Sequence, residues 1–156
     1  MPTNFIDNWG NFVTRVNTDG GSAWKAVTVT KTFSAAAGKG NIGTVALFTV
    51  TGFVKCKLYA RCTTTLTADG AATFEIGVTG STAGLIALTT ATAIDTTEIW
   101  HDATPDAPLE LSSVSTEKLL IGSIFGTVKT ANLTAGVIEF TLLYSPLSTD
   151  ATVVGV

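Results

Sequence analysis

Residues 26–33 read Ala-Val-Thr-Val-Thr-Lys-Thr-Phe. On an extended chain successive side chains point to opposite faces, so Val27, Val29 and Phe33 share one face. The threonines between them share the other face. β-branched side chains lose little rotamer freedom in a strand, and a threonine hydroxyl can face water there. This stretch therefore predicts a β-strand with one buried face.

The rest of the chain repeats such short runs of apolar and β-branched residues between glycine-rich turns, without a sustained helical period. The expected strands are Ala26–Phe33, Thr44–Thr51, Phe53–Thr65, Ala72–Thr79, Leu85–Thr90, Leu109–Ser113, Lys118–Lys129 and Val137–Tyr144. Strands at this spacing predict an all-β fold, a single-domain antiparallel β-sandwich that is jelly-roll-like. This domain is expected to span residues 25–156.

The composition restricts the possible functions. Charged residues make up 13% of the 156 residues, against about 25% in an ordinary soluble domain. The net charge of −3 does not fit a nucleic-acid-binding protein. The most apolar block, Leu119–Val128, is too short to span a bilayer, and Met1–Gly10 does not resemble a secretory signal. A surface this poor in charge is often shielded by assembly, so we expect an oligomer or a lattice component.

The first 24 residues differ from the rest, because their aromatic residues are spaced among Asn, Asp and Gly with little alternation. We expect residues 1–24 to form an N-terminal arm or an irregular edge segment. Its candidate partner-binding residues are Phe5, Trp9, Phe12 and Trp24. Aromatic side chains of this kind can anchor an arm on a neighbouring subunit. Packing against the arm's own domain is equally compatible with the sequence.

The run Ala68-Asp69-Gly70 predicts a three-residue hairpin loop with Gly70 in the left-handed conformation. In the register that this loop sets, Cys62 lies opposite Ile76, and every apolar residue of the two strands falls on one face. A two-residue turn would shift the register by one and mix the faces. The run therefore predicts that the strands on either side of it pair with each other.

The opposite face of this hairpin gathers the candidate partner-binding residues Lys55, Lys57, Tyr59 and Arg61. Glu75 is expected diagonal to Arg61. Three of the nine basic residues of the chain thus share one strand face. Two interpretations stay open, a solvated outer face of a sheet and a patch that binds a partner.

The two cysteines, Cys56 and Cys62, lie on one face if Val54–Thr64 is a single strand. They are then about 20 Å apart, which is beyond the reach of a disulfide. No Cys-x-x-Cys motif occurs. We expect buried free thiols rather than metal or redox chemistry.

The stretch Gly38-Lys39-Gly40-Asn41-Ile42-Gly43 has the letter pattern of a dinucleotide-binding fingerprint. That chemistry requires a helix after the glycines, whose amino end holds the pyrophosphate. A strand is expected here instead, at Thr44–Thr51. The stretch therefore predicts a loop, and no cofactor is expected.

The segment Asp95–Glu110 holds five of the twelve acidic residues and the single histidine, His101, next to Trp100. Asp102 adjoins His101 and would point away from it on an extended chain, which disfavours a hydrolase triad. A calcium site is chemically permissible, but the spacing of the acids matches no known calcium loop. Two prolines favour a structural loop. We expect no catalytic and no metal-binding residues, and we keep Trp100 and His101 as candidate partner-binding residues.

Four runs carry a family resemblance: Phe48-Thr49-Val50-Thr51-Gly52, Ala72-Thr73-Phe74-Glu75-Ile76-Gly77-Val78, Thr82-Ala83-Gly84-Leu85-Ile86-Ala87 and Glu98-Ile99-Trp100-His101-Asp102-Ala103-Thr104-Pro105-Asp106-Ala107. Together they resemble small structural proteins of tailed bacteriophages, over roughly residues 45–110. Such proteins include capsid decoration, or cement, proteins. These are β-sandwich modules that sit on the capsid lattice and clamp neighbouring major capsid subunits. The family implies no catalytic residues.

The resemblance implies a non-enzymatic virion structural protein, a capsid decoration or cement protein that stabilises the head. Its implied partners are the major capsid protein and neighbouring copies of itself. The implied assembly is a homo-oligomer, with a trimer preferred to a dimer. It would lie on the capsid exterior of the virion after synthesis in the host cytoplasm, without nucleic-acid or membrane partners. One alternative is a tail- or fibre-associated module that binds a host surface glycan through aromatic residues: Trp9, Trp24, Tyr59 and Trp100. Another is a hydrolase that uses His101.

Overall fold

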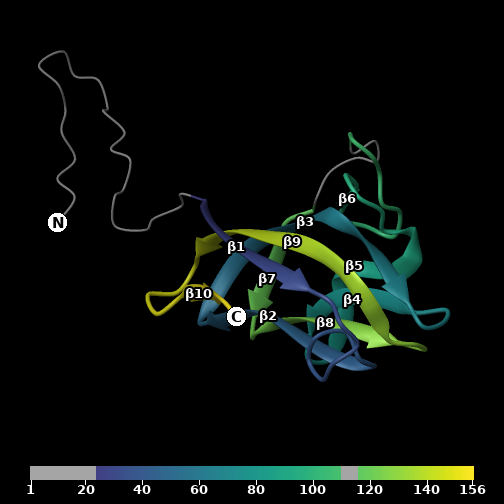
Figure 1. Cartoon of the computed structure of the whole chain (residues 1–156). Coiled ribbons are helices and arrows are strands. Elements are labelled where there is room, and N and C mark those ends of the chain that lie inside the picture. Colours follow the sequence, from purple (N-terminus) through teal and green to yellow (C-terminus); the bar gives the residue numbers. More distant parts are fainter. Residues whose placement is uncertain (1–23, 110–115) are drawn as a thin grey trace, which may run out of the picture.

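The computed structural model describes residues 24–109 and 116–156. Within these residues the strands form two antiparallel sheets that pack face to face (Figure 1). Sheet 1 has the order β1 (Lys25–Thr32), β9 (Leu133–Pro146), β3 (Phe53–Ala68) and β6 (Ile99–Trp100), and β7 (Lys118–Ile121) also pairs with β3. Sheet 2 has the order β10 (Thr152–Gly155), β2 (Gly43–Thr51), β8 (Ile124–Lys129), β4 (Thr73–Val78) and β5 (Ser81–Thr90).

This architecture confirms the expected all-β sandwich, whereas the jelly-roll connectivity stays a prediction. A single turn of 3-10 helix, η1 (Ala91–Ala93), follows β5. Most of the expected strands are found within a few residues of their expected bounds. The structure adds two short strands that the sequence analysis did not predict, β6 and β10. The strand expected at Leu109–Ser113 lies outside the described residues except for Leu109, which is in no strand.

The long central strand β3 shows how alternation builds the core. Its inward side chains are buried at every second position from Val54 to Cys62. They face an equally alternating set on β9, with Leu58 opposite Leu142 and Ala60 opposite Phe140. Burying each large apolar side chain contributes about 1.5–3 kcal/mol before conformational entropy is counted. Period-two placement of apolar residues therefore accounts for the inner face of sheet 1.

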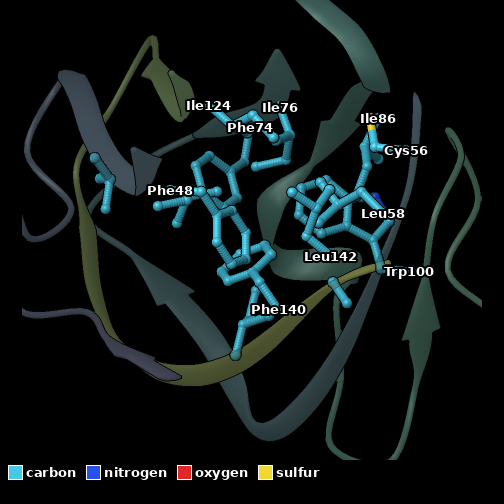
Figure 2. Close-up of a cluster of buried hydrophobic side chains, with 14 of the residues drawn as sticks. Phe48, Cys56, Leu58, Phe74, Ile76, Ile86, Trp100, Ile124, Phe140 and Leu142 are labelled. Atoms are coloured by element: carbon cyan, nitrogen blue, oxygen red, sulfur yellow. The ribbon is translucent and has the colours of Figure 1, made fainter. Parts of the chain in front are cut away.

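Aromatic rings fill the space between the sheets (Figure 2). The ring of Phe74 stacks on Trp100 with 5.3 Å between centroids, and Phe140 meets Trp100 edge-on at 6.4 Å. Such ring pairs add to the free energy of burial. Gly126 makes room for this cluster, because a Cβ there would lie 2.5 Å from the Phe74 ring. The two sheets are thus held together by a buried aromatic centre.

The predicted hairpin at Ala68-Asp69-Gly70 is wrong. β3 pairs with β9, β6 and β7 in sheet 1, whereas β4 lies in sheet 2 between β8 and β5. Residues 69–72 therefore carry the chain from one sheet to the other, and Gly70 does not have a positive φ. Asp69 accepts hydrogen bonds from the backbone and side-chain amides of Asn132, both at 2.8 Å. Alternation fixed which side chains point inward, but β9 satisfies the same pattern as β4.

The predicted single strand Lys118–Lys129 is divided into β7 and β8, which belong to different sheets. The break falls at Gly122, whose φ is +103°, a conformation that residues with a side chain rarely adopt. The chain crosses from sheet 1 to sheet 2 at this point. The glycine gives the chain the sharp change of direction that this crossing needs.

Candidate functional site

The outer face of sheet 1 brings together three of the candidate partner-binding residues. Trp24 directly precedes β1, and its ring is approached by the ammonium groups of Lys55 at 4.9 Å and Lys57 at 5.7 Å from the centroid. Glu117 lies 3.4 Å from the Lys55 ammonium and 3.8 Å from that of Lys57. The indole remains 39% exposed. A cation over an exposed ring is worth about 0.5–1 kcal/mol, so this group is ordered by weak contacts and stays accessible.

Apolar side chains adjoin this group. We call Phe53, Leu119, Ile121 and Leu147 the apolar corner. We call Lys55 and Lys57 the lysine row. On β7, Leu119 pairs with Lys55 and Ile121 pairs with Phe53, so both side chains point outward beside this row. Leu119 is 69% exposed and Ile121 is 73% exposed. The backbone N–H of Leu147 donates to the Phe53 carbonyl, and its side chain is also exposed. Leu119 and Ile121 were expected in a strand, but their exposure was not predicted.

The other candidates on β3 lie farther along the same face. The Tyr59 ring meets the His101 ring edge-on, with 6.3 Å between centroids. Arg61 donates to Glu139 at 3.2 Å, and both side chains are partly exposed. The prediction that Glu75 lies diagonal to Arg61 is wrong, because Glu75 belongs to sheet 2. Tyr59 and His101 therefore form an aromatic pair on this face, separate from Trp24.

Trp100 is not available to a partner, which corrects its place among the candidates. Its side chain is fully buried in the core, and its indole N–H donates to the Thr89 hydroxyl at 3.0 Å. A buried indole needs such an acceptor, and Thr89 on β5 provides it across the two sheets. Trp100 thus holds the Asp95–Glu110 segment to the core. Phe5, Trp9 and Phe12 lie outside the described residues.

The described part of the Asp95–Glu110 segment is braced by its own acidic residues. The Glu98 carboxylate accepts from the Asp95 backbone N–H at 2.6 Å, and the Asp102 carboxylate accepts from the Thr104 N–H at 2.7 Å. Short local bonds of this kind are typical of structural loops. Residues 24–109 and 116–156 contain no group of three or more His, Cys, Asp or Glu side chains that could hold a metal ion.

The glycine-rich stretch Gly38–Gly43 is a loop between two strands, as predicted. β2 begins at Gly43, so no helix follows the glycines and the pyrophosphate-binding arrangement is not formed. The Asn41 carboxamide accepts from the Gly38 N–H at 2.9 Å, and Asn132 accepts from the Ile42 N–H at 2.9 Å. The first bond closes the loop on itself, and the second ties it to the turn between β8 and β9.

Both cysteines are buried free thiols, as predicted. Burial raises the pKa of the Cys56 thiol to about 11, although the charge of Lys118 acts against this shift. Burial likewise raises the pKa of Cys62 to about 11, and its thiol donates to the Thr64 carbonyl at 3.2 Å. Because the thiolate is the reactive form, both residues are poor nucleophiles at neutral pH.

The outer face of sheet 2 has a different composition. Across β2, β8 and β10 its outward positions carry threonine and apolar residues: Thr44, Ala46, Thr49, Thr51, Phe125, Thr127, Thr152 and Val154. Val154 is 60% exposed. Lys129 ends this face at β8 and forms an ion pair with Glu75. The three neighbouring strands β10, β2 and β8 of sheet 2 therefore present a nearly uncharged surface.

Glu75 is the buried acid of the described residues, whereas the sequence had placed it on an outer face beside Arg61. Its side chain is 3% exposed and lies 2.7 Å from the Lys129 ammonium. Burial pushes the pKa of Glu75 upward, but hydrogen bonds from Lys129 and Thr82 and the charge of Lys129 outweigh it, so the pKa lies below its usual value. β5 bulges beside β4, since Ile76 pairs with Ile86 while Val78 pairs with Ser81. This bulge brings Thr82 to Glu75, which period-two reasoning could not predict.

Within residues 24–109 and 116–156, no helix has the length and hydropathy needed to cross a membrane. Comparison of the chain with protein-family models, with curated proteins and with solved structures gives no match. The family resemblance and the function that it implies are therefore a proposal.

Proposed function

We propose that this chain is a non-enzymatic structural protein of a tailed-phage virion, a capsid decoration protein that binds the major capsid lattice through the outer face of sheet 2. It is made in the host cytoplasm and acts on the capsid exterior as a homo-oligomer, for which a trimer is preferred to a dimer. The resemblance of four sequence runs to phage structural proteins supports the family. The composition of one sheet face supports the mode of binding.

The nearly uncharged outer face of sheet 2 carries the proposal. Interface centres are depleted of charged residues, because each charge must be desolvated on binding. Threonine and valine also have few rotamers to lose when they are covered. The ion pair of Lys129 with Glu75 compensates the charges at the margin of the face. This surface can therefore be covered at low cost in desolvation and side-chain entropy.

The mechanism is interfacial burial repeated over a lattice. Each copy covers parts of neighbouring capsid subunits, so separating those subunits requires the release of that copy. An oligomer that holds several lattice sites at once gains avidity without any new type of contact. Weak individual contacts then sum to a stable shell under internal pressure. No reacting group is needed for this activity.

Mixing the purified protein with undecorated capsids tests the proposal. We expect saturable binding with a fixed number of copies per capsid. Thr49→Lys, an exposed position at the centre of the outer face of sheet 2, should weaken binding about tenfold or more, equivalent to about 1.4 kcal/mol. Thr30→Lys is the matched control, since Thr30 is an exposed strand position on the outer face of sheet 1. Absence of binding by a folded wild-type protein would remove the proposal.

The exposed indole of Trp24 favours a second candidate, a tail- or fibre-associated module that binds a host surface glycan. Sugar rings stack on exposed aromatic faces, and Trp24 lies on the same sheet face as Tyr59. Glycan-array binding that is lost in Trp24→Ala, with Thr30→Ala unaffected, would support this candidate over capsid binding. The hydrolase alternative predicts an activity that disappears in His101→Ala.

A further inference from the structure

We infer that the outer face of sheet 1 is the binding site for residues 1–23 of the same chain, which dock on the apolar corner beside Trp24. The inference concerns a contact within one chain and does not depend on the capsid proposal. It rests on the exposure of the corner, on the direction in which the chain reaches Trp24, and on the residues that the first 23 positions contain.

The corner is an apolar surface without a partner among the described residues. Leu119 and Ile121, at 69% and 73% exposed, rank above the other exposed large apolar residues there. Both sit on β7, next to the aliphatic stems and ammonium groups of the lysine row. Adjacent exposed apolar side chains with a charged rim are typical of surfaces that are covered in the functional state.

The strand register places Trp24 near the level of this corner. β1 and β3 are both antiparallel to β9, so they run parallel to each other. Lys25 is level with Tyr144 on β9, and Tyr144 is level with Cys56 on β3. One step toward the N-terminus brings Trp24 level with Lys55, over which its ring is placed. A chain that continues in this direction next reaches the level of Phe53 and Ile121 along the strand axis, two strands away from β3.

The distance is short compared with the length of chain available. From β1 to β7 the path crosses β9 and β3, a separation of about 14 Å at the usual strand spacing. About five extended residues cover it, and the 11 residues between Phe12 and Trp24 can span about 40 Å from one to the other. Phe5, Trp9 and Phe12 can therefore all reach the corner. Tethering at Trp24 gives them a high effective concentration there, which favours the same chain over a second copy.

The residues of the segment complement the surface. Phe5, Trp9 and Phe12 provide large apolar side chains, and Asp7 lies two residues from both Phe5 and Trp9. The lysine row adjoins the corner, so an acidic residue within the aromatic run can face a cation while its neighbours cover Leu119 and Ile121. Aromatic anchors in an apolar pocket with a charged rim are the usual composition of a binding hot spot.

Paramagnetic relaxation in the full-length protein tests the inference. A nitroxide is attached to Asn8→Cys, because the buried native thiols react poorly, and the methyl signals of Leu119, Ile121 and Val154 are recorded. Chains that carry both the nitroxide and the isotope label are diluted into protein that carries neither, so that relaxation between copies is minor. We expect loss of the Leu119 and Ile121 signals, with the Val154 signal on the outer face of sheet 2 intact.

A double substitution, Trp9→Ala with Phe12→Ala, should restore the lost signals, whereas Thr14→Ala should leave them lost. Equal loss at Val154 and the corner, or no loss at all, would contradict the inference. Loss that occurs only when spin-labelled chains are mixed with isotope-labelled chains would also overturn it, because the docking would then be between copies. Each result can be read whether or not the protein binds capsids.

Discussion

The two outer faces of the sandwich are built from the same period-two strands and carry different surfaces. Sheet 1 presents the exposed indole of Trp24, two lysines, Glu117 and the apolar corner. Sheet 2 presents threonine, alanine, valine and Phe125, with its acid Glu75 buried beside a β5 bulge and paired with Lys129. Alternation decides which side chains point inward, and it leaves the outward set free to differ.

This difference separates two kinds of contact. Charges on sheet 1 are weakly held at the surface and rearrange at little cost, which suits a face that binds a chain segment. On sheet 2 the Glu75 carboxylate is buried and paired with Lys129, and the outward positions of β2, β8 and β10 are uncharged. A face of this kind suits broad, repeated contact with a second surface. The proposals above assign one role to each face.

The largest effect is expected where the β5 bulge crosses β4. A Cβ on Gly77 would overlap the Ser81 carbonyl oxygen and the Thr82 backbone, and backbone atoms cannot move aside easily. We expect Gly77→Ala to lower the free energy of unfolding by about 3 kcal/mol. Chemical denaturation measures this loss. Ala83→Ser, at an exposed position of the same bulge, is the control and should stay near wild type.

The same substitution on the two faces should give unequal losses. Lys129→Met leaves Glu75 buried without its cation, and because Lys129 is itself 47% exposed we expect a loss of about 1–2 kcal/mol. Lys55→Met removes contacts with the exposed Trp24 and Glu117 and should cost less than about 1 kcal/mol. Equal losses in urea denaturation would mean that the two faces hold their charges equally well.

A smaller effect is expected from pH. Because the pKa of Glu75 in the folded protein lies below its ordinary value of 4.5, its carboxylate stabilises the fold above pH 4.5. This contribution declines as the pH falls through the folded pKa. The stability difference between wild type and Glu75→Gln should therefore be full at pH 7 and should shrink below pH 4.5. A difference that stays constant down to pH 3 would contradict the role of the ion pair.

The sequence predicted the fold class and the inward residues of β3 because both follow from local alternation. The sequence could not predict which strand pairs with β3, because β9 and β4 both have apolar residues at alternate positions that could pair with it. β6 has two residues and β10 has four, so neither shows enough of a period to be recognised. Strand pairing over long sequence separation is a property of the whole chain.

The candidate site was predicted in part for the same reason. Lys55, Lys57, Tyr59 and Arg61 do share an outward face, as alternation requires. Trp100 was misplaced because its burial depends on Phe74 and Thr89, which reach it from the opposite sheet. The uncharged face of sheet 2 was not recognised, because it forms only when β2, β8 and β10 are placed side by side.

A cryo-electron microscopy reconstruction of capsids saturated with the protein tests the central claim, that the two faces have separate roles. The account predicts density for the shell against β2, β8 and β10, with Thr49 and Val154 covered and the apolar corner of sheet 1 turned away from the shell. Shell density against β3 and β7, with the outer face of sheet 2 open to solvent, would contradict it.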